Sequence, residues 1–161
     1  MVKVTVVPPR IDYRRCAVIA KRAVSAVVLL CALALALSTC GGSSEALQHS
    51  NNAKRLADQG KLNEAIVELD EAIRLDPKLA SAYNSRGVAY KDLGQRQRAI
   101  QDYDEAIRLD PKDAAPYVNR GLVYTKLNRD QEAERDFAKA IELGFDPARL
   151  KALIEELNKR R

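Results

Sequence analysis

Apolar residues recur every three or four positions from residue 46 onward, which is the period of an amphipathic helix. In the first stretch these residues are Leu56, Ala65, Ile66, Leu69, Ala72, Ile73 and Leu75. Gly60 interrupts the pattern midway, and Asp76-Pro77 ends it, because a residue before proline is biased away from the helical conformation. The pattern therefore predicts a helix, a tight turn, a second helix and a stop.

The same design repeats along the chain. The nine residues Asp70–Lys78 occur again, unchanged, as Asp104–Lys112, which is an offset of 34 residues. A degraded third copy follows one step later, where Ala140, Ile141 and Leu143 hold the apolar positions. A fixed period of this length is typical of solenoid proteins, in which each unit packs only against its neighbours. We therefore divide the chain into three units, at residues 46–79, 80–113 and 114–147.

The ends of the helices can also be assigned from the sequence. Each unit has a residue suited to a left-handed turn between its helices, namely Gly60, Gly94 and Asn128. The third unit ends as Gly144-Phe145-Asp146-Pro147, so we expect its last turn to differ from the other two. Residues 148–161 form an amphipathic stripe that predicts a capping helix, with apolar positions Leu150, Leu153, Ile154 and Leu157. The predicted fold is all-α: an α-solenoid of three helix-turn-helix units plus a C-terminal capping helix.

The period and its small and aromatic residues resemble the tetratricopeptide repeat (TPR) over residues 46–147. Counted from the first residue of each unit, the fourth place holds Tyr83 and Tyr117, the eighth Ala53, Gly87 and Gly121, the eleventh Leu56, Tyr90 and Tyr124, the twentieth Ala65, Ala99 and Ala133, the twenty-seventh Ala72, Ala106 and Ala140, and the thirty-second Pro77 and Pro111. The third unit departs from the family, because Phe145 replaces this proline. The resemblance implies a concave surface formed by the first helix of each unit.

Charged residues vary together between the two helices of units two and three. Arg86 and Arg120 stand at the seventh place, and Asp102 and Asp136 stand at the twenty-third. We predict an ion pair in each unit, Arg86 with Asp102 and Arg120 with Asp136; the other possibility is solvated charges. His49 is the only histidine and stands where the other units have tyrosine, so we interpret it as a ring that replaces an aromatic spacer.

By the same resemblance, partner contacts come mainly from the first helices of the units. The candidate residues are Ser50, Lys54, Asn84, Ser85, Lys91, Asn119 and Lys126, with Val88, Val118 and Leu122 as an apolar floor. The peptide-carboxylate clamp of chaperone-binding relatives is mostly absent, because the matching places hold Ser50, Lys54, Ser85, Ala115 and Asn119. We expect a shallow groove that suits a short peptide or one helix of a protein partner.

Residues 1–39 have the pattern of an export signal. The segment 23–39 has no charge and follows Lys21-Arg22, and a basic segment before an apolar one is typical of a signal peptide. Two other interpretations of this segment are an uncleaved membrane anchor and ordinary signal cleavage near Ala34-Leu35-Ala36. Residues 1–20 carry more basic charge than export needs, so we expect translation to begin downstream of Met1.

The apolar segment ends at Leu37-Ser38-Thr39-Cys40, which resembles the lipobox of bacterial lipoproteins, with Thr39 in place of the usual Gly, Ala or Ser. The resemblance implies a lipoprotein-type signal peptide and acylation of Cys40. Residues 40–45 would then be a lipid-anchored tether, and the Gly/Ser composition of residues 41–44 predicts that it is flexible. It also implies the bacterial cell envelope, at the outer membrane facing the periplasm, because Gly41 is not the Asp that favours inner-membrane retention. No cysteine follows Cys40, so the mature chain would have no internal disulfide.

Charge and composition argue against other classes of protein. The net charge is +5, but six of the 27 Lys and Arg and only one of the 22 Asp and Glu precede position 40, so the remaining chain is neutral and unsuited to nucleic acid. With one histidine and no cysteine in the repeats, no nucleophile–base pair or zinc site can be built on familiar lines. We expect no enzyme activity, metal, cofactor, nucleic acid or small-molecule substrate.

We therefore predict that the protein is a non-catalytic adaptor, anchored to the bacterial envelope, that presents its groove to a peptide or helix of a protein partner. Two alternatives stay open at this point. One is a self-assembling structural subunit of an envelope complex, for example of the pilotin type. The other is a soluble TPR adaptor, which applies if residues 1–40 do not belong to the translated protein.

Overall fold

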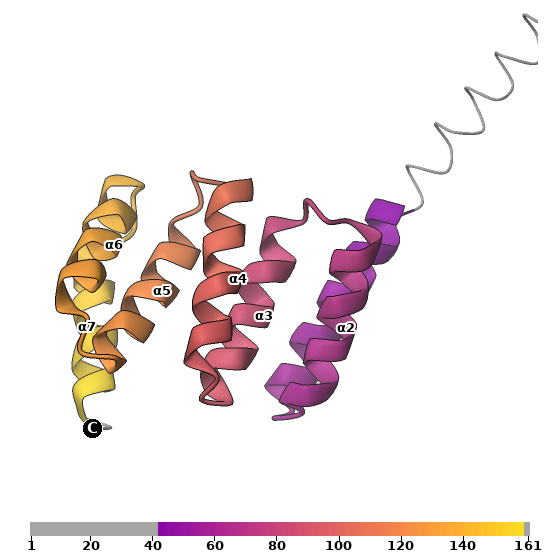
Figure 1. Cartoon of the computed structure of the whole chain (residues 1–161), viewed down its shortest axis with the longest axis horizontal. Coiled ribbons are helices and arrows are strands. Elements are labelled where there is room, and N and C mark those ends of the chain that lie inside the picture. The colour runs from indigo at the N-terminus through magenta and orange to yellow at the C-terminus, as the bar shows by residue number, and fades with distance from the viewer. Residues whose placement is uncertain (1–41, 160–161) are drawn as a thin grey trace, which may run out of the picture. The chain divides into compact units, whose positions relative to one another are not determined.

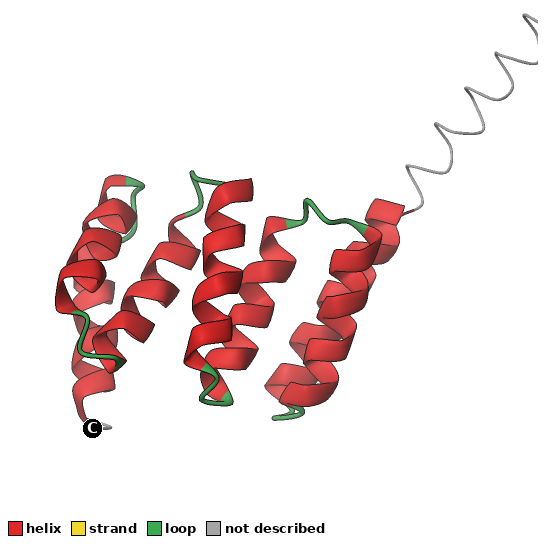
Figure 2. Cartoon of the chain, viewed as in Figure 1, coloured by secondary structure: helices red, strands yellow, loops and turns green. Residues whose placement is uncertain are grey.

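The computed structural model describes residues 42–159, so the predictions made for residues 1–41, the signal peptide and Cys40 among them, lie outside it. The described residues form seven helices and no strand, joined by short loops (Figure 2). They are a first helix at residues 42–58, α2 (Leu62–Leu75), α3 (Ala80–Asp92), α4 (Arg96–Leu109), α5 (Ala114–Lys126), α6 (Asp130–Glu142) and α7 (Pro147–Lys159). The predicted all-α class is confirmed.

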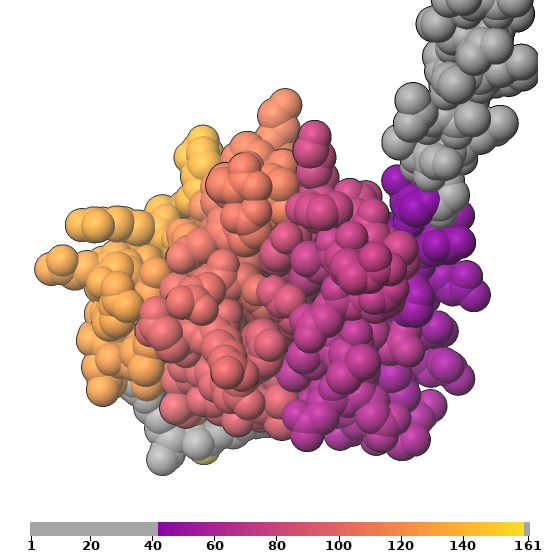
Figure 3. All heavy atoms as spheres, turned by 45° about the vertical axis from the view of Figure 1, so that its right-hand side comes forward, coloured from indigo at the N-terminus to yellow at the C-terminus, as the bar shows by residue number. Residues whose placement is uncertain are grey.

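The helices stand side by side in chain order and form three pairs: helix 42–58 with α2, α3 with α4, and α5 with α6 (Figure 1). Neighbouring pairs contact through α2 and α3 and through α4 and α5. The space-filling view shows the consequence as successive bands of colour, each covering its own strip of the face (Figure 3). The predicted helix-turn-helix solenoid is therefore confirmed.

Small residues allow the two helices of a unit to approach closely. The alanines at the twentieth place are at most 3% exposed in all three units, and those at the twenty-seventh place at most 1%. In unit one, Ala65 and Ala72 pack with Ala53 and Leu69 in one apolar cluster, and Ala82 of the next unit joins it. Because the interior is closely packed around these alanines, a larger side chain at any of these places would push the two helices of the unit apart.

The turns within the units have the predicted geometry. Gly60 and Gly94 have φ of 77° and 75°, and Asn128 has φ of 57°. These are left-handed values, which glycine adopts without strain and asparagine tolerates better than most residues. The sequence prediction for all three turns is confirmed.

The third unit ends differently from the first two, as predicted. Units one and two end at Asp76 and Asp110 in extended conformations, with φ of −135° and −134°. Unit three instead continues into Gly144 with φ of 94°. Phe145, which stands where the other units have proline, packs into the apolar cluster that includes Leu150 of α7.

The start of the first helix differs from the expected tether. The Gly/Ser composition of residues 41–44 predicts a flexible segment within the tether at 40–45, but residues 42–45 are helical and continuous with the rest of helix 42–58. The position of a Cβ on Gly42 would lie 3.5 Å from the carbonyl oxygen of Leu75, and Ala46 is fully buried. Contacts with the described core thus stabilise a helical start that the Gly/Ser composition does not favour.

Two arginines connect the units. Arg86 donates Nε and Nη2 to Asp102 at 2.9 and 2.7 Å, and Arg120 does the same to Asp136 at 2.8 and 2.6 Å, which confirms both predicted ion pairs. Each arginine also donates Nη1 to an aspartate of the preceding unit: Arg86 to Asp70 and Arg120 to Asp104, both at 2.5 Å. The second contact was not predicted. Each guanidinium therefore bridges the second helices of two successive units.

The last helix packs on the first helix of unit three. Leu150 of α7 is 5% exposed and lies in one cluster with Tyr117 and Val118 of α5, and Leu153 and Ile154 pack against the same cluster. The amphipathic stripe predicted for this helix is therefore the face that covers unit three. Within residues 42–159, none of the helices combines the length and apolar character needed to cross a membrane.

Candidate binding groove

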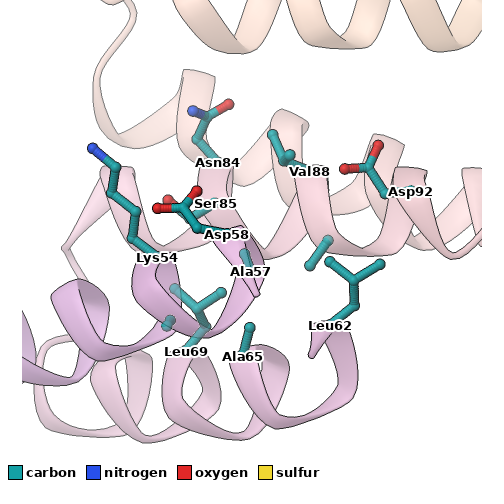
Figure 4. Close-up of a pocket in the computed structure, with 12 residues that line it drawn as sticks. Lys54, Ala57, Asp58, Leu62, Ala65, Leu69, Asn84, Ser85, Val88 and Asp92 are labelled. Atoms are coloured by element: carbon teal, nitrogen blue, oxygen red, sulfur yellow. The ribbon is translucent and has the colours of Figure 1, made fainter. Parts of the chain in front are cut away.

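Four of the predicted groove residues line one cleft between helix 42–58, α2 and α3 (Figure 4). These are Lys54, Asn84, Ser85 and Val88. The cleft has a volume of about 460 Å³ and is completed by Ala53, Ala57, Asp58, Leu62, Ala65, Leu69, Ala89 and Asp92. Figure 4 shows Leu69 and Ala65 at its base, with Val88 and Asp92 reaching it from α3.

Two side chains at this cleft are smaller than those at the same places of the next junction of units. Between units two and three, the ring of Tyr103, at the twenty-fourth place, packs with Val123, at the tenth place of the following unit. Between units one and two, the same places hold Leu69 and Ala89, and both line the cleft. Leu69 is smaller than Tyr103, and Ala89 is smaller than Val123. The side chains at the junction of units one and two therefore occupy less volume.

The rim of the cleft carries two carboxylates and one amine. Asp58 and Lys54 are exposed, and their side chains form no hydrogen bond or ion pair with other residues in the range 42–159. Asp92 has one ionic neighbour among these residues, Lys91, at 3.4 Å, and half of its side chain remains exposed. In Figure 4, Lys54 and Asp92 lie on opposite sides of the cleft. Charged groups are thus available at both sides of an apolar floor.

Three further predicted residues, Lys91, Leu122 and Lys126, line a second hollow of about 290 Å³. Its other lining residues are Asp92, Arg96, Val123 and Leu157. The amine of Lys126 donates a hydrogen bond to the backbone oxygen of Leu157 at 3.3 Å. The C-terminal helix therefore forms one wall of this hollow and takes up one of the two amines predicted there.

The other predicted groove residues do not line either hollow. Val118, predicted as apolar floor, is 3% exposed and packs with Leu150, because α7 covers this part of α5. Asn119 donates its side-chain amide to Asn84 at 3.0 Å, which connects α5 to α3 beside the first cleft. Ser50 is half-buried outside both hollows. The predicted groove is thus divided into two hollows, and the larger of these two lies between units one and two.

Three residues have positions that the sequence did not predict: His49, which contacts Glu68, and Asp58 and Asp92, which line the cleft. His49 Nδ1 lies 2.6 Å from Glu68 Oε2, so this histidine joins the two helices of unit one in addition to filling an aromatic position. Asp58 and Asp92 were not among the predicted groove residues. The signal for them was present, because both occupy the thirteenth place, at which Lys126 was selected.

Within residues 42–159, no group of three or more His, Cys, Asp or Glu residues is positioned to hold a metal ion. The ionisable groups on the rim of the first cleft are two carboxylates and an amine, above a floor of Ala and Leu side chains. Such a site can bury an apolar side chain and pair with a charge beside it.

Comparison with family models identifies the repeats. The model described as TPR repeat matches residues 53–94 and 89–128, and the model described as tetratricopeptide repeat matches residues 114–144. Residues 53–144 belong to the tetratricopeptide repeat family. The TPR assignment from the 34-residue period is thereby confirmed. A comparison with curated proteins found no significant match.

Solved TPR structures have the same fold. The second TPR of Spaghetti (RPAP3), bound to the HSP90 peptide SRMEEVD, is 26% identical and has a TM-score of 0.61, covering 63% of this chain and 94% of that chain. The Arabidopsis OM64 TPR domain is 27% identical with a TM-score of 0.67, covering 74% and 99% of the two chains. MamA is 28% identical with a TM-score of 0.60, covering 63% and 59%.

Proposed function

We propose that this TPR protein is a non-catalytic adaptor that binds a peptide or helix of a protein partner in the cleft between units one and two. The observation that carries this proposal is the cleft itself, about 460 Å³ in volume, with an apolar floor and charged groups on its rim. Support comes from the similar TPR of Spaghetti, whose structure contains a bound peptide. A pocket of this kind orients a partner through a few polar contacts while apolar burial supplies most of the affinity.

Unit three contributes less to this site than the family pattern implies. The C-terminal helix α7 covers Val118 of the predicted floor and accepts a hydrogen bond from Lys126. The proposed partner therefore contacts mainly helix 42–58 and α3. This is a short site, and it favours a short peptide or a single helical turn over an extended segment.

The proposal is tested by photocrosslinking in cells. A photoreactive amino acid at Val88, on the wall of the cleft, is expected to give a covalent adduct with a protein partner. The matched control is the same amino acid at Val67, which is 68% exposed on α2 and does not line the cleft. Adducts that form equally from both positions, or from Val67 alone, would place the partner elsewhere on the molecule.

We also propose that the adaptor is displayed on the bacterial cell envelope, at the outer membrane facing the periplasm, through an acylated Cys40. Support comes from the sequence Leu37-Ser38-Thr39-Cys40, which follows a basic and then an apolar segment. Several acyl chains would hold the protein on a membrane stably, since each buried CH₂ contributes about 0.8 kcal/mol. Metabolic labelling with a fatty-acid analogue is expected to label the wild type and Cys31→Ser but not Cys40→Ser. Labelling that survives Cys40→Ser would defeat this proposal.

A further inference from the structure

We infer that the cleft between units one and two selects a partner segment in which one large apolar side chain stands next to lysine or arginine. This inference rests on the proposed function and names the chemistry of the partner. In this arrangement the partner supplies the bulky side chain that the protein itself supplies one unit later, and its cation pairs with the carboxylates on the rim.

The cleft has room for a large apolar side chain. At the junction of units two and three, Tyr103 is completely buried and packs with Val123, and the hollow there has a volume of about 290 Å³. At the junction of units one and two, the smaller Leu69 and Ala89 stand at these places, and the cleft is larger, at about 460 Å³. Leu69 and Ala65 at its base are 2% and 0% exposed, and the apolar side chains that a partner can reach are those of Ala57, Leu62 and Val88, which are half-buried. A side chain of about the size of Phe or Leu would gain burial there without displacing any part of the fold.

The charged residues around the cleft favour a cation. Of the three charged residues that line the cleft, two are the acids Asp58 and Asp92 and one is Lys54. The corresponding hollow one unit later has the opposite balance, with Lys91, Arg96 and Lys126 around the single Asp92. The first cleft is therefore the acidic one of the two. The other hollow is partly closed by Leu157 of α7, which leaves the acidic cleft as the more accessible site.

The carboxylates are available for a new contact. Asp58 pairs with no other residue in the described range, and the neighbour of Asp92 is an exposed lysine at 3.4 Å, a contact that contributes little in water. A cation brought beside a buried apolar side chain would lie in a less hydrated place, where its attraction to both acids is stronger. An acidic segment, such as the Glu-Glu of the peptide bound to Spaghetti, would instead be repelled by these two groups.

The test uses the purified full chain and three fluorescein-labelled Gly/Ser peptides of about ten residues, with Lys-Phe-Lys, Glu-Phe-Glu or Lys-Ser-Lys at the centre. Fluorescence anisotropy is expected to give at least about tenfold tighter binding for Lys-Phe-Lys than for either of the others. Equal or tighter binding of Glu-Phe-Glu would overturn the charge argument, and equal binding of Lys-Ser-Lys would overturn the shape argument.

Two sets of variants assign the binding to this cleft. Asp58→Asn with Asp92→Asn is expected to weaken Lys-Phe-Lys binding about tenfold, whereas Asp130→Asn with Glu134→Gln, which removes two charges from exposed residues of α6, leaves it unchanged. Filling the cleft with Ala53→Gly, Leu69→Phe and Ala89→Val, which copies the packing of later units, is expected to abolish binding. If this triple variant fails to fold by circular dichroism, Val88→Trp blocks the wall instead. Unchanged binding in these variants would overturn the inference.

The outcomes separate this inference from the proposed function. If Val88 crosslinks to a partner in cells but the partner segment is acidic or lacks a large apolar side chain, the adaptor proposal stands and the inference fails. If none of the peptides binds and Val88 gives no adduct, both fail. A concentration-dependent dimer that the cleft-filling variant abolishes would identify a second copy of the chain as the occupant, and this too would overturn the inference.

Discussion

The ring of Tyr103 lies directly against the backbone of Gly87, so that a Cβ on this glycine would be only 2.6 Å from Tyr103 Cε1. The contact recurs one unit later, where a Cβ on Gly121 would be 2.5 Å from Phe137 Cε1. Unit one has Ala53 and Leu69 at the same two places. A large ring at the twenty-fourth place of a unit therefore goes with glycine at the eighth place, and the smaller leucine goes with alanine.

This contact predicts that Gly87→Ala destabilises the protein. Alanine favours the helical state by about 1 kcal/mol over glycine, but its methyl group would displace a completely buried ring. We expect a net loss of about 1–3 kcal/mol in the free energy of unfolding, measured with urea. The matched control combines Gly87→Ala with Tyr103→Leu, which recreates the pair of unit one, and should recover part of the loss. A Gly87→Ala protein as stable as the wild type would contradict this account.

The hydroxyl of Tyr103 leads to a second prediction. It is buried and has no hydrogen-bond partner among residues 42–159, and burial raises the pKa of this phenol well above its usual range. Tyr103→Phe removes a polar group that is desolvated without compensation, and phenylalanine already stands at the same place in unit three. We expect stability to stay equal or to rise by up to about 1 kcal/mol in thermal unfolding. A loss of stability would mean that the hydroxyl has a partner.

The arginine bridges predict a large effect of Arg86→Ala. The variant would leave Asp102, whose side chain is 7% exposed, without its cation, and a buried charge that loses its partner costs about 3–5 kcal/mol. The two hydrogen bonds to Asp102, followed by the one to Asp70, raise the pKa of the Arg86 guanidinium, so it stays charged under all practical conditions.

Two companion variants test the geometry of that bridge by denaturant unfolding. Arg86→Lys should recover only part of the loss, because an ammonium group cannot donate to both oxygens of Asp102 and to Asp70 in a fixed plane. Arg74→Ala breaks an exposed pair with Glu71 on the surface of α2 and should leave the unfolding midpoint close to that of the wild type. Similar losses for Arg86→Ala and Arg74→Ala would refute the structural role of the bridge.

The packing of α7 predicts a loss of stability for Leu150→Ala. Leu150 is the buried residue through which α7 contacts Tyr117 and Val118, and its truncation should cost about 2–5 kcal/mol. Ile141→Ala is the control, since this side chain is 42% exposed on α6 and should cost less than about 1 kcal/mol. If Leu150→Ala unfolds at the wild-type urea concentration, α7 does not stabilise unit three.

Sequence reasoning succeeded where the three copies could be compared. The pairs Arg86–Asp102 and Arg120–Asp136 could be predicted because both members change together between unit one and the other units. The turn at Asn128 could be predicted because glycine stands there in the other copies. Repetition acts as an internal alignment, in which a difference at one place points to a difference at the place it contacts.

The cleft could not be predicted in the same way. Leu69 and Ala89 are ordinary apolar residues for a solenoid. The size of the cleft follows from both being smaller than Tyr103 and Val123, which stand at the same places of the next junction. Similarly, the stripe on α7 predicts that one face is buried but not that it covers Val118. The Gly/Ser composition of residues 41–44 predicted a flexible segment where residues 42–44 are helical, because local propensity does not include the contacts that stabilise the helix.

The arginine bridges also govern how the array could grow. Unit two has both a donor and an acceptor for these contacts between units. Its Arg86 donates a hydrogen bond to Asp70 of unit one, and its Asp104 accepts one from Arg120 of unit three. If unit two were duplicated and the copy inserted after residue 113, the arginine of the copy could pair with Asp104. The aspartate of the copy that corresponds to Asp104 could then pair with Arg120. Unit three has Ala138 where Asp70 and Asp104 stand, so any further unit of this type would bring an arginine without a second carboxylate. The chain thus contains one segment fit for tandem duplication and one that terminates the series.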